Sequence, residues 1–209
     1  MERYLVFCAH ADDEIVGMGG ALSRYAKEGK DIVTVIFSFG ERSQPHLKER
    51  HIVKKRVLES QKVDYLVGKK SLFLGLSEGR ILEQAEKFDV KGKIKRLIRK
   101  YRPEKIFTLS SMDPHKDHRE VNSVVVSAFD ELKYKGELYT FEVWNVIDES
   151  RPAIFVDVSS TFKKKLKLLK RYKSQKLSIY LLWLPIYLRA RRYGRKIGCA
   201  YAEKLYKIR

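Results

Sequence analysis

Residues 3 to 14 read Arg3-Tyr4-Leu5-Val6-Phe7-Cys8-Ala9-His10-Ala11-Asp12-Asp13-Glu14. The first seven residues are mostly apolar, and they predict a strand. The next five carry one imidazole and three consecutive carboxyl groups. A polar cluster therefore begins at the point where the first strand ends.

The rest of the chain alternates between strand-like and helix-like segments. We predict further strands at 31–37, 71–74, 105–109, 138–144 and 153–158, and helices at 15–27, 45–63, 88–101, 120–132 and 161–172. Strands that alternate with helices form a mostly parallel sheet with helices on both faces, which is an α/β fold of three layers. Ligands bind such sheets beyond the carboxyl ends of the strands, so we expect the functional residues there.

Length and composition predict one domain over residues 1–209. Hydrophobic residues make up 44% of the 209, enough for one core, and no linker rich in Pro, Gly or Ser divides the chain. The first residues lack the pattern of a secretory signal, so export is not expected. Cys8 and Cys199 are far apart in sequence, and we expect both to be buried free thiols in a reducing cytoplasm.

Two polar clusters follow predicted strands, one at residues 10–14 and one at residues 113–118, which read Asp-Pro-His-Lys-Asp-His. Three adjacent acids repel one another unless a cation compensates them. His10, Asp13 and His118 would supply two imidazoles and one carboxylate, a set typical of catalytic zinc with one position left for water. The same set also binds iron(II), so the ligands alone do not decide the metal.

The remaining polar residues of the clusters fit the other needs of a metal-dependent hydrolysis. Asp12 is a spare carboxylate that can take a proton from water as general base. His115 can donate to a developing oxyanion and to a leaving nitrogen. Asp117 can orient the ring of one of the histidines, because catalytic imidazoles usually donate their second N–H to a carboxylate or carbonyl. His46 and His51 lack such partners and are expected at the surface.

The glycines of Gly17-Met18-Gly19-Gly20 raise a dinucleotide-binding alternative. The pattern G-x-G-x-x-G would require glycine at Leu22, and the acidic loop before the helix would repel phosphate. We therefore expect these glycines to let the helix pack closely on the sheet.

Ala9-His10-Ala11-Asp12-Asp13-Glu14 and the later His115-Lys116-Asp117-His118 resemble the hallmarks of the LmbE/PIG-L de-N-acetylases, A-H-P-D-D-E and H-x-D-H. Ala11 stands where proline is usual, a change that affects the stiffness of the loop more than ligation. The resemblance covers nearly the whole chain and extends to residues 56–59, 102–103, 139–145, 173–175 and 201–203.

The resemblance implies a Rossmann-like sheet and a zinc-dependent hydrolase that removes the N-acetyl group from an N-acetylglucosamine conjugate. Some family members act on other amides, so a non-sugar amide is the alternative substrate. The resemblance implies the same ligands, base and acid as above. It also implies that Arg56 and Glu78 contact the sugar, with two alternatives: Arg56 could pair with Glu59 on its own helix, and Glu78 could be a turn residue.

The positive charge is concentrated in the last quarter of the chain. Residues 162–209 contain 16 Lys and Arg against Glu203, a net charge of +15, which leaves +3 of the total +18 for residues 1–161. The uncharged run 179–188 is shorter than the about 20 residues that a membrane-spanning helix needs, and cations flank it on both sides. This pattern is typical of an interfacial segment.

One hypothesis is therefore that residues 162–196 dock on the anionic, cytoplasmic face of a membrane and that the substrate is a lipid-linked amino sugar. The alternatives are that the apolar run packs in the core, lines the sugar pocket or forms an oligomer contact. The sequence does not predict the oligomeric state.

Two other functional classes are alternatives. A net charge of +15 on one segment can also bind nucleic-acid phosphates, but this would leave both polar clusters unexplained, and no nucleic-acid-binding motif is recognised. Nucleic acid is therefore not an expected partner. A non-haem iron oxidase is the rival enzyme, because its ligand set is the same.

Overall fold

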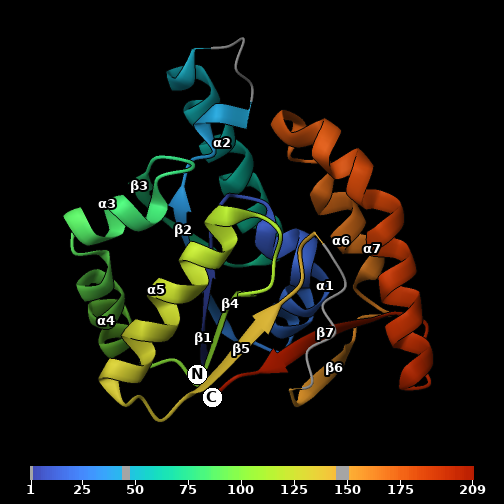
Figure 1. The fold of residues 1–209 in the computed structure, drawn as a ribbon. Helices are drawn as coiled ribbons and strands as arrows, with labels where there is room; N and C mark the ends of the chain where they lie inside the picture. The colour runs from blue at the N-terminus through green and yellow to red at the C-terminus, as the bar shows by residue number, and fades with distance from the viewer. Residues whose placement is uncertain (1, 44–47, 145–150) are drawn as a thin grey trace.

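The computed structural model describes residues 2–43, 48–144 and 151–209, and its centre is a seven-stranded sheet (Figure 1). The strand order is β3-β2-β1-β4-β5-β7-β6. Strands β1 to β5 run parallel, whereas β7 is antiparallel to both β5 and β6. The strands are β1 Arg3–Cys8, β2 Asp31–Ser38, β3 Lys70–Leu76, β4 Lys105–Leu109, β5 Glu137–Phe141, β6 Ala153–Asp157 and β7 Ala202–Lys207. The mostly parallel sheet predicted from the sequence is confirmed.

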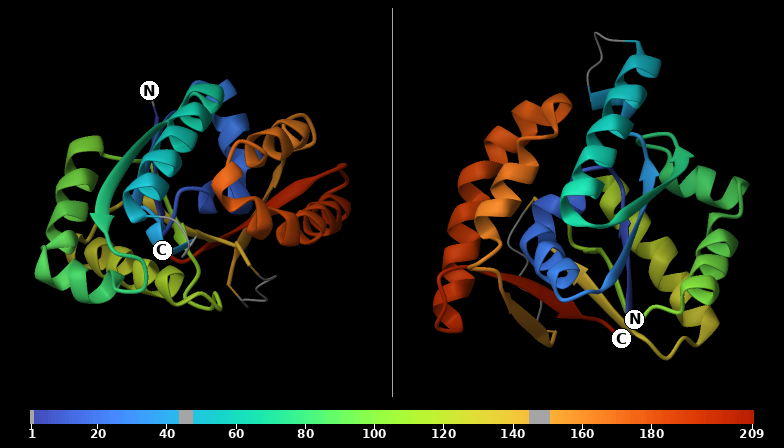
Figure 2. Two further views of the ribbon diagram at one scale, coloured as in Figure 1. Left: turned by 90° about the horizontal axis from the view of Figure 1, so that it is seen from above. Right: turned by 180° about the vertical axis from the view of Figure 1, so that it is seen from behind.

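Helices cover both faces of the sheet. Figure 2 shows α3, α4 and α5 on one face and α1, α2, α6 and α7 on the other, in agreement with the contacts of α5 with α3 and α4 and of α1 with α6. The helices are α1 Asp13–Lys27, α2 Glu49–Val67, α3 Ile81–Lys87, α4 Val90–Tyr101, α5 Lys116–Leu132, α6 Phe162–Leu169 and α7 Lys176–Lys196, with short 3-10 turns at Glu41–Ser43 and Lys173–Gln175. The predicted three-layer α/β architecture is confirmed.

The strand order changes direction between β1 and β4, which are neighbours at the centre of the sheet. From β1 the chain proceeds outward through β2 and β3, then returns to place β4 on the other side of β1. The loops that leave the carboxyl ends of β1 and β4 therefore diverge and leave a crevice, the usual ligand position in such sheets. Residues 10–14 and 113–118 lie in these two loops and in the first turns of the helices that follow them, α1 and α5.

Helix α1 packs closely on the sheet, as expected for its glycines. A Cβ atom on Gly17 would lie 2.3 Å from the Phe141 ring, and one on Gly20 would lie 2.8 Å from Val158. The helix kinks at Met18, and the Glu203 carboxylate accepts the amide N–H groups of Gly20 and Ala21 at 3.1 and 2.7 Å. Close packing and this buried acceptor hold the middle of α1, the helix whose first residue is Asp13.

Gly17→Ala is expected to lower the free energy of unfolding by about 1–3 kcal/mol, the usual cost of overpacking a core. The added methyl group would also meet the Glu142 carbonyl oxygen at 2.8 Å, so the Phe141 ring cannot relieve the contact alone. Chemical denaturation monitored by circular dichroism measures the change. An unchanged midpoint would contradict the close packing of α1.

Some predicted boundaries are wrong for identifiable reasons. The predicted helix 88–101 begins only at Val90, because Asp89 adopts a left-handed conformation (φ 47°) and its carboxylate accepts the Gly92 amide. The helix predicted at 161–172 ends at Leu169, and the strand predicted at 138–144 ends at Phe141.

The start predicted at Pro45 lies outside the described residues, as does His46. His51 is exposed as predicted, but Cys199 is only half-buried, so the expectation of a buried thiol is wrong there.

The apolar run 179–188 lies within α7, and its side chains divide between two environments. Ile179, Leu182 and Ile186 are buried, whereas Leu181, Leu184 and others are exposed. Among the described residues, no helix combines the length and apolarity that crossing a membrane requires.

Candidate metal centre

His10, Asp13 and His118 converge at the carboxyl ends of β1 and β4. One ligand atom from each of the three buried side chains lies within 4.8 Å of the others. His10 belongs to the loop after β1, Asp13 begins α1, and His118 lies in the first turn of α5. The sheet thus brings together residues that are more than 100 positions apart in the sequence.

The His10 ring faces a carboxylate on each side. Its Nε2 lies 3.2 Å from Asp117 Oδ2, and its Nδ1 lies 3.8 Å from Asp13 Oδ2. We infer that Nε2 carries the proton and donates it to Asp117, because a carboxylate only accepts. The lone pair on Nδ1 of His10 is then available to bind a metal ion on the side of Asp13. Asp117 also accepts the Gly79 amide, which holds it in place.

The His118 ring is buried between two carboxylates. Its Nδ1 lies 3.1 Å from Asp113 Oδ1 and its Nε2 lies 3.3 Å from Asp13 Oδ1, yet neither nitrogen makes a well-formed hydrogen bond to any described residue. Burial lowers the pKa of His118, but the facing carboxylates outweigh this effect and raise the pKa to about 10. A buried imidazole nitrogen that faces a carboxylate without a hydrogen bond lacks a partner. A cation bound by both groups would supply one. The donor set therefore fits a divalent metal ion.

The three consecutive acids face three different sets of partners. Asp12 Oδ1 accepts from Arg56 Nη2 at 3.2 Å, and Asp13 faces the histidines. Glu14 is fully buried and turns away to Lys69, whose Nζ lies 3.2 Å from Glu14 Oε1. Successive residues at the start of a helix point in different directions, so only one of the three acids reaches each partner.

Asp12 stands at the N-terminus of α1, where its carboxylate does not cap a helix amide of the described chain. Burial raises the pKa of Asp12, and the Arg56 guanidinium offsets part of this effect. Arg56 is 2% exposed and passes beside Gly40, where a Cβ atom would lie 2.7 Å from its guanidinium carbon. Its predicted alternative partner, Glu59, instead accepts the Ser174 amide at 3.0 Å.

His115 caps the start of α5, and its Nδ1 accepts the backbone N–H of Asp117 at 3.2 Å. Because Nδ1 accepts, we infer that the neutral ring carries its proton on Nε2. Burial lowers the pKa of His115, and the nearby His118 and His10 rings lower it further. The imidazole is thus a neutral N–H donor at the edge of the pocket.

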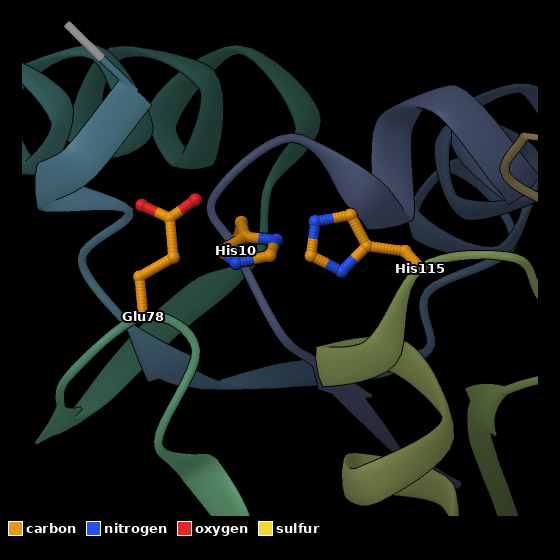
Figure 3. Close-up of side chains that lie close together, drawn as sticks. All are labelled: His10, Glu78 and His115. Carbon is orange, nitrogen blue, oxygen red and sulfur yellow. The ribbon is translucent and has the colours of Figure 1, made fainter. Parts of the chain in front are cut away.

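Glu78, which follows β3, also faces this pocket. Figure 3 shows Glu78, His10 and His115 turned toward a common space, and one ligand atom of each lies within 4.8 Å of the others. This second group is a poor metal site, because a His115 ring that accepts at Nδ1 has no lone pair at Nε2. Glu78 Oε2 accepts the Arg42 amide at 2.9 Å, so the carboxylate is held in position as a hydrogen-bond acceptor.

All the predicted site residues except Asp117 line one cavity of about 180 Å³. Asp117 lies behind it, against His10. Sequence reasoning assigned no pocket role to Val143, Trp144, Gln175 and Ser178, which also line the cavity. Segments 139–145 and 173–175 carried the family resemblance but no assigned role. Leu182 belongs to the run 179–188, for which lining the sugar pocket was one of the alternatives.

Asp113 is a further residue that sequence reasoning left without a role. Its Oδ1 lies beside His118 Nδ1 and also accepts the backbone N–H of His115 at 2.9 Å. The Asp113 carboxylate thus lies beside a ring nitrogen of His118, as the Asp117 carboxylate lies beside a ring nitrogen of His10. The signal was present in the sequence, because second carboxylates commonly accompany metal-binding histidines.

Asp113→Asn is expected to weaken metal affinity or lower activity by about 10- to 100-fold, as loss of an outer carboxylate typically does. The amide would no longer attract the Nδ1 proton of His118 as a carboxylate does. Chelator competition measures the metal affinity of the purified variant. Asp130→Asn, at an exposed acid of α5, is the control. Equal affinities for the two variants would contradict a supporting role for Asp113.

Comparisons with known proteins place these features in a family. Residues 5–129 match the family model of GlcNAc-PI de-N-acetylase, PIG-L. The diacetylchitobiose deacetylase of Thermococcus kodakarensis is 24% identical over 97% of this chain and 82% of that protein.

Two solved structures share the fold. The N,N'-diacetylchitobiose deacetylase of Pyrococcus horikoshii superposes with a TM-score of 0.83 at 23% identity, over 99% of this chain and 84% of that chain. The 4-carboxy-2-hydroxymuconate hydratase GalB of Pseudomonas putida superposes with a TM-score of 0.86 at 23% identity, over 100% and 97%.

The fold and the site define a metal-dependent hydrolase whose chemistry lies at the switch point of an α/β sheet. The chain belongs to the PIG-L family of de-N-acetylases, because the family model matches more than half of its length.

Proposed function

We propose that the protein removes the N-acetyl group from an N-acetylglucosamine conjugate, with a zinc ion held by His10, Asp13 and His118. The observation that carries this proposal is the convergence of these three buried side chains on one point, beside a spare carboxylate. When bound there, zinc would polarise the amide carbonyl and lower the pKa of a water molecule to about 7.

The protein's own residues would supply the proton transfers. Asp12 takes the proton of the attacking water, since burial raises its pKa toward the range suited to a general base. The Nε2–H of His115 donates a hydrogen bond to the developing oxyanion, and the proton that Asp12 took from the water passes to the leaving nitrogen. Asp117 and Asp113 hold the two metal-binding rings in their tautomers, so the metal-facing nitrogens keep their lone pairs.

The substrate contacts follow from the pocket walls. Arg56 is almost fully buried and bonded to Asp12, so its main role would be to hold the base, with its pocket-facing edge near the sugar. Glu78 is half-buried and would accept a hydroxyl group of the sugar. The diacetylchitobiose deacetylases among the relatives support an amino sugar as substrate.

A lipid-linked conjugate, used at the cytoplasmic face of a membrane, is the finer form of the proposal. Its support is the net charge of +15 in residues 162–209 and the fact that α7, within this basic segment, forms part of the pocket wall. An anionic surface would attract residues 162–196.

An acetate-release assay tests the function. The substrates are N-acetylglucosamine, its oligomers, lipid-linked and thiol-linked N-acetylglucosamine, and an N-acetylated amino acid, each with and without added zinc. We expect zinc-dependent acetate release from at least one sugar conjugate. Release from the amino acid alone would favour the non-sugar amide. Release from none of them would overturn the proposal, as would iron in the purified protein together with oxygen-dependent turnover.

A further inference from the structure

The outer face of α7 carries a stripe of exposed apolar side chains. It consists of Leu177, Tyr180, Leu181, Leu184 and Leu188, called here the α7 stripe, and their exposed fractions run from 56% to 77%. Their spacing of three or four residues places them on one side of the helix. The opposite side packs into the protein through Ile179, Leu182 and Ile186. Contiguous exposed apolar surface of this kind usually marks an interaction site.

Cations stand at both ends of the α7 stripe. Lys173 and Lys176 are exposed before it, and Arg192 and Arg195 are exposed after it. No acid occurs between residues 162 and 202. Arg189 does not contribute to this surface, because its guanidinium is buried and donates to the Val143 and Glu142 carbonyl oxygens. The exposed surface is therefore apolar along its middle and positive at its two ends.

This combination matches the surface of an anionic membrane. An amphipathic helix that lies in the plane of the interface buries its apolar side among the lipids and places its cations at anionic headgroups. A second copy of the chain fits less well, because an isologous contact between two stripes would bring two positive segments together. A nucleic-acid backbone would use the cations but leave the leucines without a partner.

The position of α7 connects this surface with the metal centre. Ser178 and Leu182 of the same helix line the pocket of the candidate metal centre, and each follows a residue of the α7 stripe in the sequence, Leu177 and Leu181. Figures 1 and 2 show α7 at the flank of the molecule, with one side toward α6 and the other side free. A protein docked through the stripe would hold the pocket-lining residues of α7 beside the lipid surface.

We propose that the α7 stripe and its flanking cations dock the protein on an anionic lipid bilayer, with α7 lying in the plane of the interface, so that the pocket reaches amino sugars carried on lipids. The substrate part of this proposal rests on the proposed function, whereas the docking itself does not. The two can therefore fail separately.

Co-sedimentation with vesicles tests the docking. The full chain is mixed with vesicles of phosphatidylglycerol and phosphatidylcholine, or of phosphatidylcholine alone, at low and high salt. We expect binding to the anionic vesicles that weakens at high salt, and little binding to the neutral ones.

Two variants separate the apolar and the charged contributions. The double variant Leu181→Ser and Leu184→Ser is expected to bind anionic vesicles about tenfold more weakly or worse. Its control is Leu58→Ser with Tyr65→Ser, two exposed apolar residues of α2. The triple variant Lys176→Gln, Arg192→Gln and Arg195→Gln is expected to lose about fivefold per cation at low salt. Its control replaces Lys87, Arg99 and Lys100, exposed cations of α3 and α4, by glutamine.

Three outcomes would overturn the docking proposal. The first is an absence of binding to anionic vesicles at low salt. The second is binding that the Leu181→Ser, Leu184→Ser variant retains in full, because the cations alone would then explain it. The third is a dimer in sedimentation velocity that this variant dissociates, because the stripe would then be a contact between copies. Activity on soluble N-acetylglucosamine conjugates without vesicle binding would contradict the docking proposal and support the proposed function.

Discussion

Asp12→Asn is expected to keep its metal and to lose about 10²- to 10⁴-fold in kcat, the usual contribution of a general base. Asparagine retains the size of the side chain and still accepts from Arg56, but it cannot take a proton from water. His10, Asp13 and His118 are untouched, so metal content should stay at the level of the unaltered protein. Metal analysis and steady-state kinetics on the best substrate measure the two quantities.

Arg56→Lys provides a second variant for the same group. A lysine keeps the positive charge but loses the planar guanidinium that reaches Asp12 Oδ1 at 3.2 Å. If Asp12 is the base and Arg56 holds it, this variant should lose part of kcat while its metal stays bound. Activity of Asp12→Asn within a factor of a few of the unaltered protein would eliminate Asp12 as the base.

Asp13→Asn is expected to lose the metal and, with it, all metal-dependent activity. Asp13 is the only carboxylate in the His10, Asp13, His118 group. A neutral amide in its place removes the charge that balances the cation, so metal affinity should fall by more than the about 100-fold that loss of an outer partner gives. Chelator competition on the purified variant gives the affinity.

Glu14→Gln is the matched control, because it removes the next carboxylate in the sequence. Glu14 contacts Lys69 rather than the metal group, so the metal should remain bound. The free energy of unfolding should fall by about 3 kcal/mol, the low end for breaking a buried ion pair, since Asp64 also contacts Lys69. Loss of metal in Glu14→Gln but not in Asp13→Asn would reverse the assignment of the two acids.

Much of the fold could be predicted because its signals are local. The strands from 31 and 105 and the helices near 15 and 120 have apolar side chains at the spacing of their element, and the structure contains all four. Helix α7 was not predicted, because Pro185 lies inside it and its side chains are apolar on both the buried and the exposed sides. Strand β7 was missed because the alternation in Ala202–Lys207 is interrupted by the buried Glu203.

The candidate site was predicted to the extent that its residues follow strand ends. His10 and His118 follow parallel neighbours in the sheet, so the expectation that they meet needed only the topology. Their roles as ligands, and those of Asp12 and His115 in proton transfer, stay predictions. Trp144 could not be placed, and the run 179–188 of α7 kept several alternative positions, because their local sequence patterns do not indicate which part of the fold they face.

The sequence by itself determined the class of fold, the two loops that meet, and the set of side chains available to a metal, since these depend on residue type and on short-range periodicity. Only the tertiary structure decided which partner each of the three adjacent acids faces, which carboxylate supports each histidine, and which side of α7 remains exposed. The physical reason is that a buried charge loses its hydration by water. Its position in the fold is then stable only beside an opposite charge. For Glu14 that charge is Lys69, brought to it by the packing of elements far apart in the chain.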